Sequence, residues 1–319
     1  MDISVVVPLY NEEENALILY EELKTVLEGL SLQWEIIFID DGSIDSTLDI
    51  LGGIQEKDAC VRVIGLRRNF GQTAAMTAGF DYARGDIIIT MDGDLQNDPH
   101  DIPRMIEKLN EGFDVVTGWR FLRQDPFFSR RLPSKIANRV ISWVTGVNLH
   151  DYGCTLKAFR HDVIKNINLY GEMHRFIPAI ASGMGVSFTE LKVNHRPRRF
   201  GASKYGISRT VRVILDLITV KFLLSYATRP LHVFGVVGAV SSSIGVLTVF
   251  IMTIQRQFFG IAMGNRPLLL LAILLIFMGI QFITIGLLAE LVVRTYHESQ
   301  NKPIYYVRKV LENTGRKSR

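Results

Sequence analysis

Two apolar segments in the last third of the chain constrain its fold more than any other feature. Residues 230–254 and 267–293 contain almost no charge and are 25 and 27 residues long. At about 1.5 Å per helical residue, either segment is longer than the roughly 30 Å hydrocarbon core of a bilayer. A pair of buried core helices is the alternative. Because only 12 residues separate the segments, we predict a helical hairpin that crosses a membrane twice, with both chain ends on one side.

Composition supports this prediction, and the placement of charge indicates an orientation. The chain is 48% hydrophobic and only 21% charged, which excludes a purely soluble enzyme, a disordered chain and, with two cysteines, a disulfide scaffold. A net charge of +4 is small for a nucleic-acid-binding protein. Seven basic residues follow the second segment, against two in the connecting loop. This asymmetry predicts an inner-membrane protein whose N-terminal domain and both termini are cytoplasmic.

The first 206 residues are predicted to form an α/β domain. Apolar runs at 3–8, 34–39, 61–66, 86–91, 113–117 and 188–193 read as strands, and most are separated by helical patterns. Runs of this kind indicate a mostly parallel sheet covered by helices on both faces. Residues 207–228 have amphipathic helical periodicity, which predicts a helix in the membrane interface or, alternatively, one packed on the domain. We expect the transmembrane hairpin at 229–294 and a basic tail at 295–319.

Acidic residues gather where two of the predicted strands end. Asp40 follows the second strand, and Asp92 and Asp94 follow the fourth, with Gln96 close by. Ligands of such sheets bind outside the carboxyl ends of the strands. Carboxylates are hard oxygen ligands that suit Mg²⁺ or Mn²⁺ together with a diphosphate. The alternative, which we expect for Asp41, is that these acids only form turns and cap helices.

Five motifs taken together resemble a known family. The sequence contains, in this order, VVVPLYNEEEN, FIDDGSIDST, NFGQTAAMTAGFDYARGD, MDGDLQNDP and RRFGASK. It resembles the family 2 glycosyltransferases of GT-A fold, and more narrowly the polyprenyl-phosphate glycosyltransferases, which include dolichyl-phosphate mannose synthases and bactoprenol glucosyltransferases. The resemblance covers residues 1 to about 210, and the two spans with the RFIP segment favour the bactoprenol glucosyltransferase branch. It implies a GT-A nucleotide-sugar-binding domain attached to a membrane.

The resemblance also implies roles for individual residues. The nucleotide-sugar-binding residues it implies are Pro8, Tyr10, Glu12, Asp40, Asp92 and Arg120. The metal ligands it implies are Asp92, Asp94 and Gln96, and the catalytic residues are Asp94, Asp151, Arg198 and Lys204. Arg198 and Lys204 match a basic pair on a loop that closes over the diphosphate, although a solvated basic loop is the alternative. Asp151 matches an aspartate proposed as a base, and its alternative role is to cap a turn.

A second group of basic residues is the candidate binding site for the phosphate of a polyprenyl-phosphate acceptor, the substrate to which the resemblance implies that the sugar is transferred. It consists of Arg130, Arg131, Ser134 and Lys135, at the start of a helical pattern. The alternative is a basic face at the membrane that binds no ligand. A lipid monophosphate is already largely ionised at neutral pH, since the second pKa of a phosphate ester is about 6. The reaction therefore demands positioning of the acceptor more than its deprotonation.

These observations lead to one functional expectation and its alternatives. We expect inverting, metal-dependent transfer of a hexose, with glucose from UDP-glucose as the first choice, to undecaprenyl or another polyprenyl phosphate. The same reaction with GDP-mannose or an amino-sugar nucleotide is the nearest alternative. A processive polysaccharide synthase is disfavoured because the chain has no QxxRW motif. A non-catalytic membrane adaptor is a further alternative, and the small residues of the spans also permit a homo-oligomer.

Overall fold

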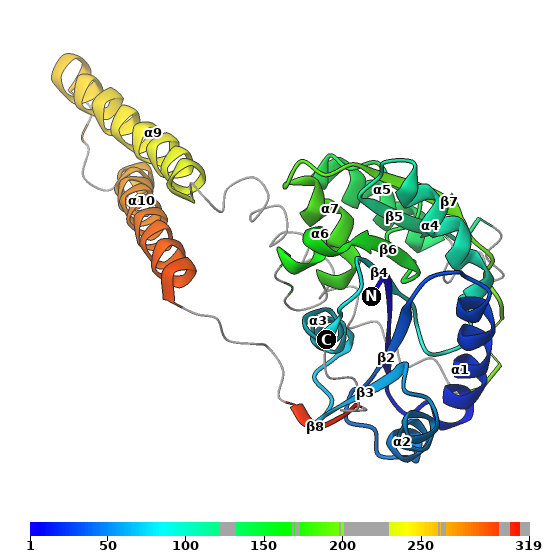
Figure 1. Cartoon of the computed structure of the whole chain (residues 1–319). Coiled ribbons are helices and arrows are strands. Elements are labelled where there is room, and N and C mark those ends of the chain that lie inside the picture. The colour runs from blue at the N-terminus through cyan, green and yellow to red at the C-terminus, as the bar shows by residue number, and fades with distance from the viewer. Residues whose placement is uncertain are drawn as a thin grey trace. The chain divides into compact units, whose positions relative to one another are not determined.

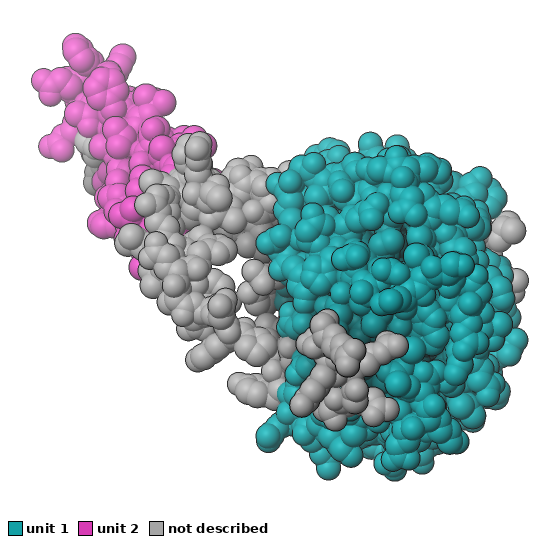
Figure 2. Space-filling model, viewed as in Figure 1, with its two compact units in different colours: residues 1–220, 303–319 teal, residues 221–302 magenta. Residues whose placement is uncertain are grey.

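The computed structural model describes residues 1–121, 132–167, 169, 173–197, 199–200, 230–260, 262, 266–299 and 307–312. The chain divides into two compact units, residues 1–220 with 303–319 and residues 221–302, which are coloured separately in Figure 2. The predicted interfacial helix at 207–228 lies outside the described residues.

The first unit is built on one eight-stranded sheet with the order β7-β5-β6-β4-β1-β2-β3-β8. The strands are β1 (Ile3–Leu9), β2 (Trp34–Asp40), β3 (Val61–Leu66), β4 (Ile87–Thr90), β5 (Val115–Trp119), β6 (Lys157–Arg160), β7 (Phe188–Lys192) and β8 (Val307–Leu311). Strand β6 is antiparallel to both β4 and β5, and β8 is antiparallel to β3, whereas the other pairings are parallel. The predicted mostly parallel α/β sheet is therefore confirmed.

Helices cover both faces of this sheet, as the unalternated strand sequences require (Figure 1). The longer helices are α1 (Glu13–Glu28), α2 (Thr47–Lys57), α3 (Gln72–Tyr82), α4 (Ile102–Asn110) and α5 (Leu132–Thr145). Shorter ones are η1 (Pro99–Asp101), α6 (His161–Lys165), η3 (Met173–Phe176) and α7 (Ile177–Ser182). Helices α1, α2 and α4 bury their apolar residues in one core cluster with the strands. Helix α3 packs on β1 and β2, where a Cβ on Gly79 would collide with Val6 and Ile39.

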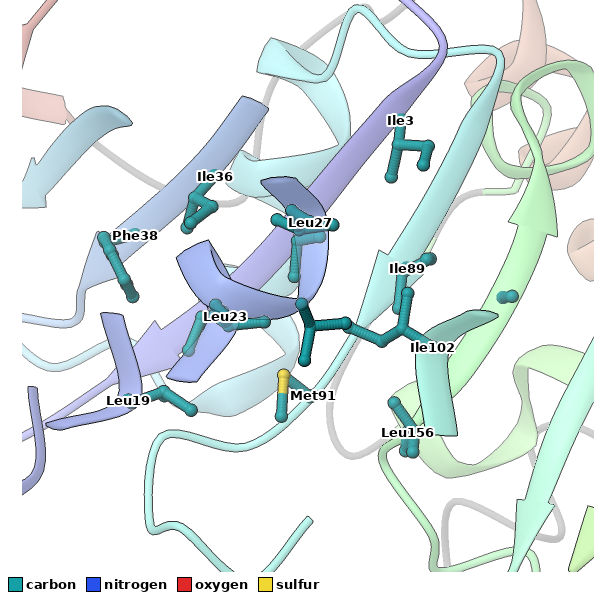
Figure 3. Close-up of a cluster of buried hydrophobic side chains, with 14 of the residues drawn as sticks. Ile3, Leu19, Leu23, Leu27, Ile36, Phe38, Ile89, Met91, Ile102 and Leu156 are labelled. Carbon is teal, nitrogen blue, oxygen red and sulfur yellow. The ribbon is translucent and has the colours of Figure 1, made fainter. Parts of the chain in front are cut away.

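The main core explains why the first strands are so apolar. Leu19, Leu23 and Leu27, spaced by four along α1, are fully buried and lie against the β-strand side chains, including Ile36 and Phe38 (Figure 3). Burying a side chain of this size contributes roughly 1.5–3 kcal/mol each. This packing fixes the strand register, and with it the positions of the loops that follow the strands.

The second unit is a pair of long apolar helices, α9 (Pro230–Phe259) and α10 (Pro267–Ser299). Only 11% of the most apolar window of either helix is buried, which is the opposite of what core helices show. The two helices contact through small residues: a Cβ on Gly238 would lie 2.5 Å from the carbonyl oxygen of Gly279. Ser241 also donates a hydrogen bond to the carbonyl of Leu275 at 3.1 Å. Both predicted spans are thus helical and long enough to cross a membrane.

The chain returns to the first unit after α10. Strand β8 pairs with β3 at the edge of the sheet, in the segment for which the sequence predicted only a basic tail. Glu312, directly after β8, lies 3.1 Å from Arg62 and 3.0 Å from Arg84. Because Arg62 is buried and also pairs with Glu35 at 3.1 Å, Glu312 links the end of β8 to a buried ion pair. The tail is therefore in part a component of the α/β sheet.

Candidate active site

The candidate site lies at the edge of the sheet where β1, β2, β4 and β5 end. The loops that follow β1 and β2 are joined by hydrogen bonds to their side chains. Asn11, held at a positive φ of 51°, accepts a hydrogen bond from the Ile44 amide at 2.9 Å, and Ser43 accepts one from the Asn11 amide at 2.8 Å. The Glu12 amide donates to Thr47 at 2.9 Å. Of the predicted nucleotide residues, Pro8 and Asp40 lie at the ends of β1 and β2, and Tyr10 and Glu12 follow β1; all but Asp40 are partly exposed.

Asp40 and Asp41 differ in role although they are neighbours. Asp40 is 1% exposed and accepts hydrogen bonds from the Ser43 amide, while burial raises its pKa. Asp41 accepts the backbone amides of Phe70 and Gly71 at 2.8 and 2.9 Å, and burial raises its pKa to about 6. Asp41 therefore fixes the start of α3, in agreement with the structural role predicted for it.

The Asp92–Gln96 motif follows β4 in a tight turn. Leu95 has a positive φ of 61°, and the Gln96 amide donates to Asp94 at 3.2 Å, so the backbone curls around the Asp94 carboxylate. Asp92 accepts a hydrogen bond from the Gln72 side chain, at the start of α3, at 2.6 Å. This contact with Gln72 was not predicted, since the two residues are brought together only by the packing of α3 on the sheet.

The donor atoms of this turn fit a divalent cation. Asp92, Asp94 and the side-chain oxygen of Gln96 are hard oxygen ligands, the kind that Mg²⁺ and Mn²⁺ prefer. Within the described residues, no group of three or more His, Cys, Asp and Glu side chains could hold a metal ion on its own. Such a site would need further oxygen atoms to complete the coordination.

Arg120, which directly follows β5, forms a salt bridge with Asp151. Its Nε and Nη2 atoms donate to the two carboxylate oxygens of Asp151 at 2.7 and 2.9 Å, in the bidentate geometry that arginine favours. Both side chains are largely buried, at 15% and 4% exposed. Although burial opposes its charge, the neighbouring Asp151 carboxylate raises the pKa of Arg120 above its usual value, with a smaller contribution from Asp92. A permanent cation is therefore held at this edge of the sheet.

Lys157, at the start of β6, is a further buried cation that sequence reasoning missed. It is 1% exposed, pairs in register with Thr90 of β4, and donates to the Tyr152 carbonyl at 3.4 Å. Burial lowers its pKa to about 8. Its neighbourhood includes Asp151, so it belongs to the same electrostatic environment as Arg120. Strand β6 was not predicted, so the sequence carried no local signal for a buried lysine at this position.

The predicted basic loop begins beside the metal motif. The Arg196 amide donates to the Gln96 carbonyl at 2.9 Å, and the Arg196 guanidinium pairs with Glu22 and Asp98 at 2.6 Å each. Asn97 and His195 form a β-bridge. Arg198 and Lys204, the predicted diphosphate ligands, lie outside the described residues, as do Arg130 and Arg131 and the side chains of Ser134 and Lys135. The structure therefore describes the first residues of the loop, His195 and Arg196, which lie next to Gln96 and Asn97.

A solved structure supports the fold of this domain. Glucosyl-3-phosphoglycerate synthase from Mycobacterium tuberculosis, solved with Mn²⁺ and UDP-glucose, superposes with a TM-score of 0.55 at 18% identity, covering 70% of this chain and 78% of that one. At this identity the likeness concerns the fold alone. Together with the acidic turn and the fixed arginine, it defines a domain of the GT-A class.

The family follows from the sequence comparisons. Residues 4–167 match the Glycosyl transferase family 2 profile. A dodecaprenyl-phosphate galacturonate synthase of Rhizobium johnstonii is 44% identical over 98% of this chain and 94% of its own length. An undecaprenyl-phosphate 4-deoxy-4-formamido-L-arabinose transferase of Salmonella choleraesuis is 40% identical over 97% of this chain and 93% of its own. The chain belongs to glycosyl transferase family 2 and is a glycosyltransferase.

Proposed function

We propose that the protein transfers a sugar from a nucleotide-diphosphate donor to polyprenyl phosphate at the cytoplasmic face of a membrane, with inversion at the anomeric carbon. The observation that carries the proposal is the arrangement of an acidic turn, Asp92 to Gln96, and a fixed cation, Arg120, at one edge of the sheet. The names of the two relatives, which cover nearly the whole chain, both include a polyprenyl phosphate. The apolar helices α9 and α10 suit an acceptor that is itself confined to the membrane.

The chemistry of the donor matches the charges of the site. A diphosphate gains negative charge as it leaves the sugar, so cations that are already in place lower the barrier. Arg120 is one such cation, and Arg198 and Lys204 are proposed to add two more. When bound by Asp92, Asp94 and Gln96, Mg²⁺ or Mn²⁺ supplies Lewis-acid stabilisation to the diphosphate oxygens.

Asp151 is proposed to orient Arg120 rather than to act as a base. Both of its carboxylate oxygens accept hydrogen bonds from the Arg120 guanidinium, at 2.9 and 2.7 Å. The acceptor phosphate is largely ionised at neutral pH, since its second pKa is about 6. Its oxygen can therefore attack the anomeric carbon while the nucleoside diphosphate departs from the opposite side, without a covalent enzyme intermediate. A product with retained configuration would rule out this single displacement.

The identity of the sugar is the finer part of the proposal. The sequence favours glucose from UDP-glucose, whereas the relatives are named for galacturonate and for 4-deoxy-4-formamido-L-arabinose. A panel of UDP-glucose, UDP-galacturonate, a UDP-linked formamido-arabinose and GDP-mannose, offered with one polyprenyl phosphate, decides among them. The donor with the highest kcat/KM identifies the sugar, and transfer from none of them contradicts the proposed reaction.

The test of the reaction uses the full-length enzyme in detergent and radiolabelled donor. We expect label in the lipid fraction that depends on Mg²⁺ or Mn²⁺, disappears with excess EDTA and returns when the cation is restored. Asp94→Ala should lower the rate by about 100-fold or more, on the scale of losing one preorganised electrostatic group. Asp49→Asn, an exposed carboxylate on α2, is the matched control and should match the wild type. Metal-independent transfer, or full activity of Asp94→Ala, would contradict the assignment of the acidic turn.

A further inference from the structure

A glutamate on the edge strand β7 holds the turn that carries Asp151. One carboxylate oxygen of Glu190 accepts the backbone amides of His150 and Asp151, at 2.8 and 3.3 Å. Its other oxygen lies 2.7 Å from Nδ1 of the His150 ring. The Glu190 side chain is only 13% exposed, whereas the His150 side chain is 65% exposed, so the carboxylate is the buried partner of these contacts. A single carboxylate thus fixes two successive peptide groups and one ring.

The His150 ring is also held from its flat side. It stacks on Trp119 with a centroid distance of 4.1 Å and an interplanar angle of 16°. Trp119 directly precedes Arg120, and His150 directly precedes Asp151, so two neighbouring pairs of residues face each other. The aromatic pair lies beside the ion pair, and Lys192 of β7 lies 5.4 Å from the Trp119 ring centroid. The contacts of His150 therefore hold the residue that directly precedes Asp151, whose carboxylate binds Arg120.

Helix α5 holds the same turn from a third direction. Asn138 donates a hydrogen bond to the His150 carbonyl at 2.7 Å, and Ser142 donates to the Leu149 carbonyl at 3.5 Å. These contacts fix the carbonyl side of the turn, whereas Glu190 fixes the amide side. Glu190 is the charged member of the set, and hydrogen bonds to an ionised acceptor are stronger than neutral ones.

We propose that Glu190 is a positioning residue: by binding the His150–Asp151 turn, it sets the direction of Asp151 and, through Asp151, that of the Arg120 guanidinium. This inference rests on the proposed function, in which Arg120 stabilises the departing diphosphate. A group of this kind must be in place before the reaction, since a displacement of about 1 Å can cost roughly 100-fold in rate. Glu190 touches neither substrate in this scheme and acts only through the turn.

The test is a set of variants of the full-length enzyme. Glu190→Ala removes all three contacts and is expected to lower kcat about 10-fold to 100-fold. Glu190→Gln keeps a carbonyl oxygen for the two amides and is expected to restore most of the rate. The matched control is Asp114→Ala at the other end of the β5–β7 pair, where Asp114 accepts the Ser187 amide at 2.8 Å. This variant removes a similar contact between the same strands and should keep wild-type kinetics.

A double-mutant cycle separates positioning from a merely structural role. If Glu190 acts through Arg120, then Glu190→Ala should change the rate less than twofold in an Arg120→Ala background. Glu190→Ala alone within twofold of the wild type, or a loss repeated in full in the Arg120→Ala background, would overturn the proposal. The same double-mutant cycle can also be measured as the affinity of each variant for UDP in the presence of Mn²⁺, and this measurement needs no polyprenyl phosphate. A wild-type enzyme that binds UDP but transfers nothing to polyprenyl phosphate would instead contradict the proposed function.

Discussion

Arg120 and Asp151 show how a single residue type is required by geometry rather than by charge alone. The guanidinium makes two parallel hydrogen bonds to the carboxylate, at 2.7 and 2.9 Å, which the point charge of lysine cannot reproduce. We expect Arg120→Lys to lower kcat by about 10-fold to 100-fold, because the remaining ammonium is misplaced relative to the diphosphate. Steady-state kinetics with the best donor measure this.

The control for that substitution is Arg104→Lys. Arg104 pairs with Asp101 at 2.8 Å on α4 but is half exposed, so its pairing contributes little and its replacement should leave kcat unchanged. If Arg120→Lys also kept the wild-type rate, a positive charge at this edge would suffice, and the fixed orientation would have no part in catalysis.

Lys157 leads to a prediction about stability and pH. Burial lowers its pKa from 10.5 to about 8, so between these pH values the unfolded chain binds more protons at this position than the folded one. Folding is therefore disfavoured by Lys157 at neutral pH, and this cost is relieved as the pH rises from 8 towards 10.5. The Lys157→Met variant has no group that titrates at this position. We expect this variant to have a higher Tm than the wild type at pH 7, and we expect the difference in Tm between the two proteins to be smaller at pH 10. A difference that stays constant across this range would contradict a buried, titrating ammonium.

The same residues show what sequence reasoning reaches at this scale. The proximity of Asp92, Asp94 and Gln96 was predictable because they lie within five positions and follow a recognisable strand, and their role as ligands stays a prediction. Arg120 and Asp151 were each assigned a place in the site, but their pairing was not predicted, because it joins positions 31 residues apart. The Glu190 contacts with the His150–Asp151 turn span about 40 residues and arise only when β5 and β7 pair. Such partners depend on the finished sheet and leave no local pattern.

At the scale of elements, the longer helices and the parallel strands were predictable because their apolar periodicity is local and strong, whereas the short α6 and η3 were not predicted. Two strands were not predicted. Strand β6 is four residues long and includes the charged residues Lys157 and Arg160, so it does not read as a buried apolar run. Strand β8 carries Arg308 and Lys309 on an edge of the sheet, where exposed charge is common and hides the strand pattern. Both strands pair antiparallel to their neighbours, and their position depends on this pairing in the folded sheet rather than on a local sequence pattern.

The contact between α9 and α10 leads to a prediction for these elements. A Cβ on Gly279 would lie 2.5 Å from the Gly238 carbonyl oxygen and 2.9 Å from the Ser242 amide. Gly279→Val should force the helices apart and cost about 1–3 kcal/mol, as overpacking of a close contact does. Thermal unfolding in detergent should show a lower Tm. Ala239→Val, on an exposed face of α9, is the control and should leave Tm unchanged. Equal Tm values for both variants would mean that this helix contact does not hold in solution.

At the scale of the whole molecule, the path of the chain restricts how it can be placed in a membrane. The α/β unit contains residues on both sides of the helix pair, since β8 returns to pair with β3. Two helices that each cross the bilayer once bring the chain back to the side from which it left, so the pairing of β8 is compatible with two crossings and not with one. The excess of basic residues after α10 predicts that this side is the cytoplasm, and this orientation stays a prediction.

This topology can be tested by single cysteines in a Cys60→Ser background, which leaves the buried Cys154 in place. We expect Asp49→Cys on α2 and Lys309→Cys on β8 to react with a membrane-impermeant maleimide only after cells are opened. Ala262→Cys, between α9 and α10, should react in intact cells once the outer envelope is permeabilised, because two crossings place this loop on the far side of the membrane. Labelling of Lys309→Cys but not of Asp49→Cys in intact cells would contradict the pairing of β8 with β3, and labelling of both would mean that the orientation is reversed. Equal labelling of all three positions before lysis would mean that α9 and α10 do not cross the bilayer.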